Sequence, residues 1–220
     1  MENFYKEASN QLIIVKENGE KIINPPSVEN LTIKSYGGGY NVITLHEPFH
    51  FESLSIVVTG DIDIEIQAGC YFGSKGLIKK SRNTRKNKLE IGKDFHCGSN
   101  CTIDLTDAGD ITIGDDAKWS WNIYIKSDDT HPVFNINTKE CVNKSTQIVI
   151  GNHVWIGMNA VILKNSIIPD NSVIGAYSVV AKKFDEENVV IAGNPARICK
   201  KNINWTHGSV EGYCLKNNKE

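Results

Sequence analysis

The sequence predicts an all-β protein, a parallel β-helix in which short strands wind into a triangular coil. The first observation is a six-residue period of large aliphatic residues, at Ile150, Ile156, Ile162, Ile168, Ile174 and Val180. The second is a small or β-branched residue at the fifth place of each unit, at Val154, Ala160, Ser166, Ser172 and Ser178. The third is a long polar stretch, residues 126–147, that interrupts the repeats.

The six-residue period fits neither common secondary structure. A helix needs apolar residues near period 3.6, and an amphipathic strand needs period 2. A short strand plus a corner can make one side of a triangular prism, and stacked turns then pair their strands in parallel around one apolar column. The aliphatic residue fills this column, and the small residue fits where space is tight. Glycine, which often takes the second place, is expected to relieve the backbone at the bends.

The N-terminal part of the chain shows a weaker form of the same pattern. Residues 31–72 contain alternating strand-like runs such as LTIKSY, YNVITL and IDIEIQAG, broken by glycine. We expect these runs to form early, less regular coils. Residues 1–30 are expected to cap the open end of the prism.

Two further blocks, which start at Ile91 and Ile113, follow the six-residue rule before the main repeat. The distance between them is not a multiple of six, so we expect a bulge at residues 106–110. In this phase Cys97 and Cys101 take inward positions, which predicts that both thiols fill the core.

The polar stretch at 126–147 is the long loop of the predicted prism. A long loop inside a regular repeat is usually functional, and this one contains His131, followed by proline. Residues 79–88 are rich in lysine and arginine and are interpreted as a solvated surface loop, with contact to an anionic polymer or a CoA phosphate as the alternative. Residues 184–220 leave the repeat and are expected to cap the far end or to cross to a neighbour. The chain, residues 1–220, then forms a single β-helix domain with coils over 31–183.

Composition narrows the classes of function. The formal net charge is −2, which argues against a strongly electrostatic partner such as nucleic acid. The sequence contains no apolar run of about 18 residues and no export signal, so we expect a cytoplasmic protein with reduced cysteines and no transmembrane segment. A metal cluster of His96 with Cys97 and Cys101 is an alternative, disfavoured because the repeat places both cysteines inward; no metal is expected.

The C-terminal half resembles a known family. The run IGNHVWIGMNAVILKNSIIPDNSVIGAYSVVAKK, the later VVIAGNPARICKK and the THP of the long loop resemble the hexapeptide-repeat acyltransferases. The likeness is greatest to the O-acetyltransferases of capsular polysaccharides, including those that modify sialic acid polymers. It spans about residues 91–201 and is more specific for the fold and for acyl transfer than for the acceptor.

This resemblance implies a left-handed parallel β-helix that assembles as a homotrimer, with active sites between adjacent subunits. It also implies acetyl-CoA as co-substrate and a carbohydrate as acceptor. The reaction would be direct transfer to a hydroxyl, with neither a metal nor an acetylated enzyme intermediate.

The resemblance assigns His131 as the general base, since THP matches the catalytic loop of the family. An imidazole suits proton transfer near neutral pH, although a loop histidine taken alone more often has no chemical role. Its orienting partner should be a carboxylate or a carbonyl, by analogy with other histidine-dependent acyl transfer. The sequence leaves four carboxylates open, namely Asp104, Asp107, Asp128 and Asp129.

Two further residues match the acceptor side of the family site. Trp155 takes the sixth, outward place of its unit, and the resemblance implies contact with acceptor or cofactor; packing in a trimer interface is the alternative. Asn100 matches an acceptor-side asparagine, with a stacked corner residue as the alternative. Interface packing is also expected for Trp119 and Trp121.

For CoA, the resemblance implies a groove between two subunits. Gly157 and Ala176 match positions where small residues let the pantetheine arm approach the backbone. Lys182, Arg197 and Lys200 match basic positions near the CoA phosphates. Repeat geometry and solvated charge, respectively, are the alternatives for these two groups.

Three other functions are compared with this hypothesis. N-acetylation of an amino sugar or nucleotide sugar would use much the same motifs. A non-catalytic β-helix that binds carbohydrate would use residues 126–147 as a recognition loop. A zinc lyase of the carbonic anhydrase type needs three converging imidazoles, and the spacing of His96, His131 and His153 does not match that set; His153 is interpreted as a surface or interface residue.

Overall fold

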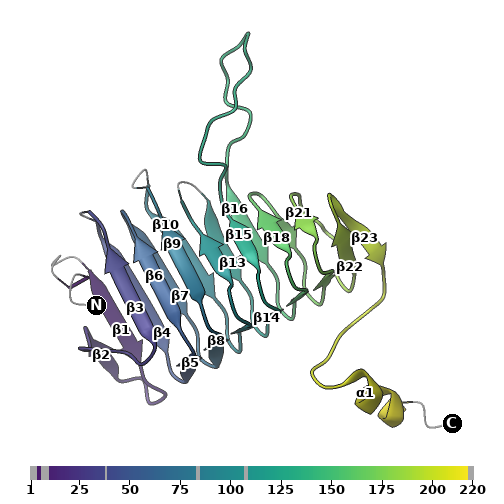
Figure 1. The fold of residues 1–220 in the computed structure, drawn as a ribbon, viewed down its shortest axis with the longest axis horizontal. Coiled ribbons are helices and arrows are strands. Elements are labelled where there is room, and N and C mark those ends of the chain that lie inside the picture. Colours follow the sequence, from purple (N-terminus) through teal and green to yellow (C-terminus); the bar gives the residue numbers. More distant parts are fainter. Residues whose placement is uncertain (1–3, 6–9, 38, 83–84, 107–108, 218–220) are drawn as a thin grey trace.

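The computed structural model describes residues 4–5, 10–37, 39–82, 85–106 and 109–217, and the chain forms a three-sided prism of stacked turns (Figure 1). Each full turn adds one strand to each of three sheets, and nearly all neighbouring strands are parallel. The predicted all-β parallel coil is therefore confirmed.

The three sheets are named here by their place in the turn, with strands given in spatial order. Sheet 1 contains β2 (Lys21–Ile23), β1 (Gln11–Val15), β4 (Asn41–His46), β7 (Ile62–Ile66), β10 (Asn87–Ile91), β13 (Asp110–Ile113), β16 (Gln147–Ile150) and β19 (Ile167–Ile168). Sheet 2 contains β5 (Phe49–Phe51), β8 (Cys70–Phe72), β11 (His96–Cys97), β14 (Lys118–Trp119), β17 (Trp155–Ile156), β20 (Val173–Ile174), β22 (Val190–Gly193) and β23 (Ala196–Lys200). Sheet 3 contains β3 (Leu31–Ser35), β6 (Leu54–Val58), β9 (Gly76–Lys80), β12 (Thr102–Asp104), β15 (Tyr124–Lys126), β18 (Val161–Leu163) and β21 (Val179–Val180).

The register of the strands follows the six-residue period. Ile150 pairs with Ile168 and Ile156 with Ile174, so that residues one full turn apart lie side by side. The early strand-like runs obey the same rule, since β3, β4, β6 and β7 pair in parallel with strands of the next turn. The runs within 31–72 thus form parallel turns of the prism, and β1, inside the expected cap, also pairs in parallel with β4.

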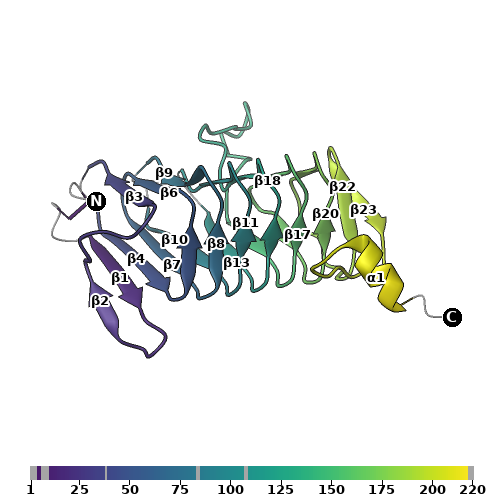
Figure 2. The same cartoon turned by 60° about the horizontal axis from the view of Figure 1, so that its bottom comes forward.

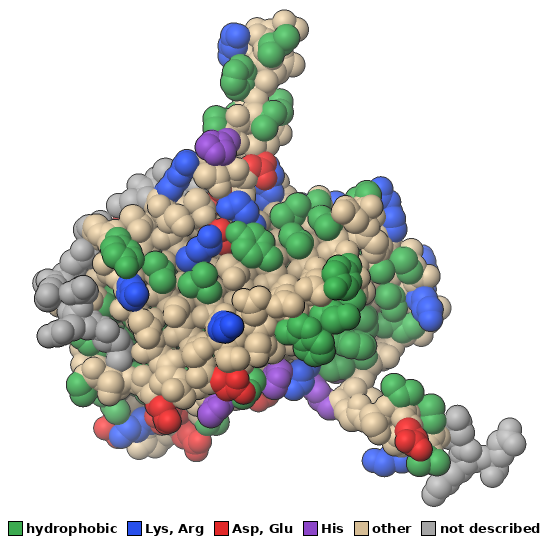
Figure 3. All heavy atoms as spheres, viewed as in Figure 1, with side chains coloured by type: hydrophobic (Ala, Val, Ile, Leu, Met, Phe, Trp, Pro, Cys, Tyr) green, Lys and Arg blue, Asp and Glu red, His purple; other side chains and the backbone are tan. Residues whose placement is uncertain are grey.

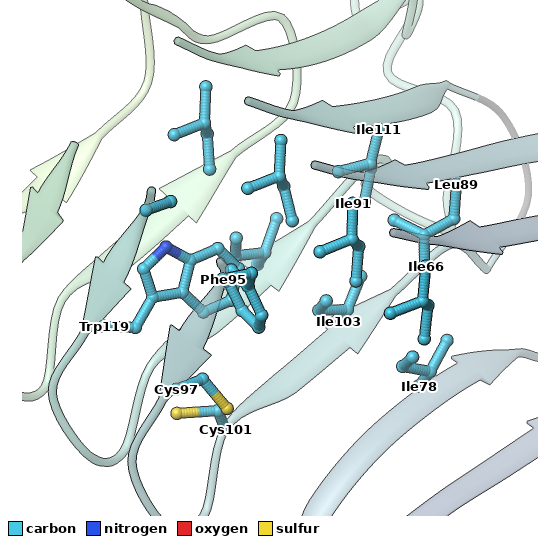
Figure 4. Close-up of a cluster of buried hydrophobic side chains, with 14 of the residues drawn as sticks. Ile66, Ile78, Leu89, Ile91, Phe95, Cys97, Cys101, Ile103, Ile111 and Trp119 are labelled. Atoms are coloured by element: carbon cyan, nitrogen blue, oxygen red, sulfur yellow. The ribbon is translucent and has the colours of Figure 1, made fainter. Parts of the chain in front are cut away.

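The core is one continuous apolar column inside the prism (Figure 4). Cys97 and Cys101 are buried in it as free thiols, which confirms their interpretation as core residues. Trp119 is also buried and packs edge-on against Phe95, with ring centroids 4.8 Å apart. The prediction of interface packing for Trp119 is therefore wrong, because this residue takes the first place of its unit, which points into the column.

The corners of the prism depend on the fourth residue of each unit, a position that the repeat pattern does not single out. In the units from Ile150 onward this residue has a positive φ, at His153, Asn159, Asn165, Asn171 and Tyr177. Asparagine and aspartate tolerate this left-handed conformation better than most residues. Glycine at the second place serves another purpose, because a Cβ at Gly157 would lie 2.7 Å from the backbone nitrogen of Ala176 in the next turn.

The two ends of the chain depart from the parallel coil. β2 runs antiparallel to β1 at the edge of sheet 1, and β23 runs antiparallel to β22 at the edge of sheet 2. The chain then leaves β23, and Figure 2 shows it ending in α1 (Val210–Asn217) beside the prism. α1 buries none of its residues. In the part of the chain described, no helix is long and apolar enough to span a membrane.

Candidate active site

The segment between β15 and β16 projects from the prism as a narrow finger (Figure 1). Its two limbs are joined by a bridge between Phe134 and Cys141, and the N–H of Val142 donates to the carbonyl of Val133 at 2.8 Å. Hydrophobic side chains are exposed along it (Figure 3), namely Val133, Phe134, Ile136 and Val142. The finger thus presents apolar surface away from its own prism.

His131 lies at the root of this finger and is exposed. Its backbone is held on both sides: its N–H donates to the carbonyl of Asp129 at 2.7 Å, and its carbonyl accepts from Nδ2 of Asn143 at 2.9 Å. Among the described residues, the imidazole itself has no hydrogen-bond partner. The backbone of His131 is therefore held at the root of the finger, while its exposed ring has no hydrogen bond to the described residues.

The two carboxylates that lie nearest to His131 in the sequence, those of Asp128 and Asp129, have other hydrogen-bond partners. Asp128 accepts from the backbone N–H of Thr130 at 2.6 Å. Asp129 accepts from Nζ of Lys164 at 2.7 Å and from Nδ2 of Asn143 at 2.8 Å. Burial opposes ionisation of Asp129, but the hydrogen bonds from Lys164 and Asn143 outweigh it and lower the pKa of this carboxyl. Among the described residues, neither carboxylate forms a hydrogen bond with the imidazole of His131.

Asp104 forms a buried charged cluster beneath the finger. Its carboxylate lies 3.0 Å from Nζ of Lys79 and 3.4 Å from Nζ of Lys126, and it accepts from the Tyr124 hydroxyl at 2.9 Å. Burial opposes its ionisation, but hydrogen bonds from Thr106, Lys79 and Tyr124 lower its pKa. This cluster anchors the start of the finger and does not contact His131. The fourth candidate, Asp107, and part of the expected bulge at 106–110 lie outside the described residues.

Lys164 and Arg82 position the root of the finger; Lys164 had no expected role, and Arg82 was expected only as part of the basic loop at 79–88. Nζ of Lys164 donates to the carbonyl of Asn143 as well as to Asp129, so it bridges the two limbs. Arg82 donates to the carbonyl of Thr130 at 3.0 Å, directly before His131. The one sequence feature that could have indicated the role of Lys164 is its place in the turn that directly follows the loop.

The basic segment at 79–88 is an exposed loop at residues 81–82 and 85–86, as expected, but its two ends belong to strands β9 and β10. Lys79 and Lys80 belong to β9, and Lys80 is buried, with its ammonium donating to the Arg85 carbonyl at 3.0 Å. Arg85 pairs with Asp110 at 2.7 Å and Lys86 with Asp63 at 2.7 Å. Since these cations pair with local acids, this segment offers little free positive charge; residues 83–84 lie outside the described part.

Trp155 lies on β17 in sheet 2 and is 43% exposed, as its outward place in the repeat predicts. The finger with His131 leaves the prism between sheets 3 and 1. No hydrogen bond or ring contact joins His131 to Trp155 in the described chain. The two principal site residues therefore belong to different faces of one prism.

Residues 201–209, called here the C-terminal segment, lie beside Trp155. Contacts among His153, Asp116, Trp205 and His207 hold the segment there, and we call this group the His153 clasp. Nδ1 of His153 lies 2.6 Å from Oδ2 of Asp116, and its Nε2 lies 2.9 Å from the carbonyl oxygen of Trp205. The indole of Trp205 stacks on His153, with centroids 4.1 Å apart, and donates to the His153 carbonyl at 2.8 Å. His207 adds a contact to Asp116 at 3.0 Å.

The clasp shifts the ionisation of its members. Burial opposes the charged form of His153, but its contacts with Asp116 and the Trp205 carbonyl raise the pKa of the imidazole. Burial likewise opposes the charged form of Asp116, but contacts with His153 and His207 lower its pKa. His153, interpreted from the sequence as a surface or interface residue, is half-buried and fastens the C-terminal segment.

The remaining candidate residues occupy two regions. Asn100 is a corner residue with φ of 60°, and its Nδ2 donates to Oδ1 of Asn122 one turn on at 2.7 Å, which is the stacked-corner geometry. Gly157 and the exposed Ala176 face each other across adjacent turns. Three exposed cations lie near the C-terminal end of the prism, namely Lys182, Arg197 and Lys200.

Comparison with known proteins gives the following similarities. The family described as bacterial transferase hexapeptide (six repeats) matches residues 147–182. The polysialic acid O-acetyltransferase of Escherichia coli O1:K1 / APEC is 38% identical over 122 residues, which cover 56% of this chain and 39% of that protein. WbbJ of Escherichia coli (strain K12), provisionally named a lipopolysaccharide biosynthesis O-acetyl transferase, is 35% identical over 154 residues, covering 62% of this chain and 78% of WbbJ.

Among solved structures, the polySia-specific acetyltransferase NeuO matches with a TM-score of 0.70 at 22% identity, covering 86% of this chain and 99% of NeuO. This likeness shows the fold, the left-handed parallel β-helix that the resemblance implied. The chain spans only about two fifths of the length of the first polysialic acid O-acetyltransferase (39%).

Proposed function

The chain belongs to the bacterial hexapeptide transferase family, and from this premise we propose that it transfers an acetyl group from acetyl-CoA to a hydroxyl of a sugar or polysaccharide. The observation that carries the proposal is the placement of His131. An imidazole without a local partner stands at the root of a finger that is braced by Lys164, Asn143 and Arg82. Relatives named as O-acetyltransferases support the reaction type.

In this mechanism His131 takes the proton of the acceptor hydroxyl as its oxygen attacks the acetyl carbonyl. The carbon–oxygen ester bond forms, the carbon–sulfur bond breaks, and CoA leaves as a thiolate that recovers the proton. A base positioned in this way contributes about 10²–10⁴-fold to the rate. Gly157 and Ala176 line the approach of the pantetheine arm, while Lys182, Arg197 and Lys200 supply cations for the CoA phosphates.

The proposed assembly is a homotrimer with the site shared between two protomers. His131 and Trp155 lie on different faces of one prism, and the finger exposes Val133, Phe134 and Ile136. A neighbouring prism that covers this apolar surface would bring its own Trp155 toward His131. Trp155 would then contact the acceptor or the cofactor, and Asn100 the acceptor.

The proposal is tested by mixing the protein with acetyl-CoA and capsular or lipopolysaccharide oligosaccharides, and by following CoA release with a thiol reagent. An ester product is labile in mild alkali, whereas an amide is not. We expect release of acetate from the product in alkali, and a fall in kcat of about 10²-fold or more in His131→Ala. His50→Ala, another exposed imidazole on β5, is the matched control. An alkali-stable product, or unchanged turnover in His131→Ala, would overturn the proposal.

A further inference from the structure

A pocket of about 800 Å³ lies between sheet 2 and the C-terminal segment. Three aromatic side chains line it, from β17 (Trp155), the C-terminal segment (Trp205) and α1 (Tyr213). Asn204, Thr206 and Ser209, which carry polar side chains, line it as well. Broad aromatic faces next to a few hydrogen-bonding groups suit a ligand that is apolar on one side and rich in hydroxyls on the other, as a sugar ring is.

The pocket also has a distinct charge. Lys118 of β14 lines it, and its ammonium has no ion pair among the described residues. His207 lines it too, but its Nε2 is taken by Asp116 at 3.0 Å. No aspartate or glutamate is among the described lining residues. An uncompensated ammonium in a partly desolvated pocket favours an anionic ligand group.

The wall of the pocket is fixed in advance. One face of Trp205 lies against His153, at an interplanar angle of 6°, and its Nε1–H is held by the His153 carbonyl. Trp155 stands 6.3 Å from Trp205 between ring centroids, inclined by 48°. Two indoles inclined at such an angle form a corner rather than a flat patch. Because Trp205 is held by His153, less entropy is lost when a ligand binds against it.

We propose that this pocket is a subsite for an acidic saccharide unit of the acceptor, with Trp155 and Trp205 against the sugar ring and Lys118 paired with its carboxylate. The inference rests on the proposed function and makes it more specific, because Trp155 belongs to both the transfer site and the pocket. Trp205 and Lys118 would be specificity-determining residues supplied by parts of the chain that the resemblance left without a role.

The test is direct binding to the full-length protein without acetyl-CoA, by calorimetry or ligand-observed NMR. The probes are oligosialic acid and its carboxyl-reduced form, which keeps the ring and hydroxyls but lacks the charge. We expect the acidic probe to bind about 10-fold or more tightly than the reduced one, the usual worth of a hydrogen bond to a charged group. Lys118→Gln should remove this difference and Lys118→Arg should restore it.

Two controls make the result decisive. Lys93→Gln changes an exposed lysine outside the pocket and should leave the preference intact. Trp205→Phe should weaken both probes alike, since it reduces the stacking surface without touching the charge. Equal binding of the two probes, or equal effects of Lys118→Gln and Lys93→Gln, would overturn the subsite. Selective binding without acetyl transfer in the assay above would instead overturn the proposed function and leave the subsite standing.

Discussion

Nζ of Lys164 lies 2.7 Å from Oδ2 of Asp129 and also donates to the carbonyl of Asn143, so that one ammonium joins the two limbs of the finger below His131. Lys164 belongs to the following turn of the prism, which ties the finger to the rigid coil. The backbone of His131 is therefore held, through Asn143, by a residue that need not touch the substrate.

Replacing Lys164 with methionine should lower kcat about 10-fold, because small misplacement of a catalytic group is costly in rate. Stability should change by about 1 kcal/mol or less, as is usual for a partly exposed ion pair. Steady-state kinetics and thermal unfolding measure the two effects. Lys139→Met, which removes the ammonium over the Phe134 ring near the finger tip, is the control. Equal losses in both variants would show that Lys164 does not position His131.

Mixed trimers test whether the site is shared. His131→Ala and Trp155→Ala chains should each be inactive alone, yet subunit exchange between them should restore activity. If each site takes His131 from one protomer and Trp155 from the next, random mixing gives about a quarter of the wild-type sites. Activity before and after unfolding and refolding the mixture together measures this. A mixture as inactive as its components would place both residues in one chain's site.

The pH dependence of the His153 clasp follows from its two pKa shifts. Both ring nitrogens face acceptors, so only the doubly protonated imidazole can donate to Asp116 and to the Trp205 carbonyl. The pKa of His153 is raised above its ordinary 6.5, so this stabilisation is complete below that value and is lost as pH rises through the folded pKa. The pKa of Asp116 is lowered from 3.8, so its share is complete above that value and is lost as pH falls through its folded pKa.

We therefore expect residues 201–217 to be held against the prism in mildly acidic solution and released in alkali. Limited proteolysis or hydrogen exchange of this segment, measured from pH 5 to 9, reports the release. His153→Asn should leave the segment loose throughout and flatten the profile. A profile in wild type that is already flat would contradict the role of His153.

Asn165 should show how a corner residue combines backbone and side-chain effects. Its φ is 63°, and its Oδ1 accepts from the N–H of Thr146 at 2.7 Å at the end of the finger. Asn165→Ala should lower the free energy of unfolding by about 2 kcal/mol, because alanine resists this φ and the hydrogen bonds are lost. Asn165→Gly should cost only about 1 kcal/mol, since glycine adopts the conformation freely. Denaturant titration distinguishes them, and equal losses would mean that the backbone conformation contributes nothing.

The repeat made the fold predictable, and its limits explain what was missed. The six-residue period placed Ile150 and its counterparts in the column and Trp155 outside it. Side chains along a strand alternate between the inside and the outside of the prism, and this alternation follows from local backbone geometry. The same rule also pointed Trp119 inward, but its size suggested an interface. The corner conformation of His153 and Asn165 was not predicted, because a positive φ is a backbone property that several polar residues can satisfy.

The site was less predictable, because its contacts join residues far apart in the chain. The resemblance assigned His131, yet nothing local in the sequence links Lys164 to Asp129 or Trp205 to His153. The candidate carboxylates near His131 could not be separated by sequence distance, and the structure pairs Asp128, Asp129 and Asp104 with other partners. The C-terminal segment contains no repeat, so no sequence pattern predicts that it packs against sheet 2.

The two antiparallel strands at the edges of the coil have a consequence for solubility. A stack of parallel turns ends in strands with unpaired backbone groups, which another molecule could use to continue the winding into a fibre. At the edge of sheet 1, β2 runs against the direction of the coil, and at the edge of sheet 2 β23 does the same. A second molecule that extended the coil would meet, at either edge, a strand that runs opposite to the direction of the coil. These two edges thus resist continuation of the coil, one at each end of the prism, and losing either hairpin should favour aggregation.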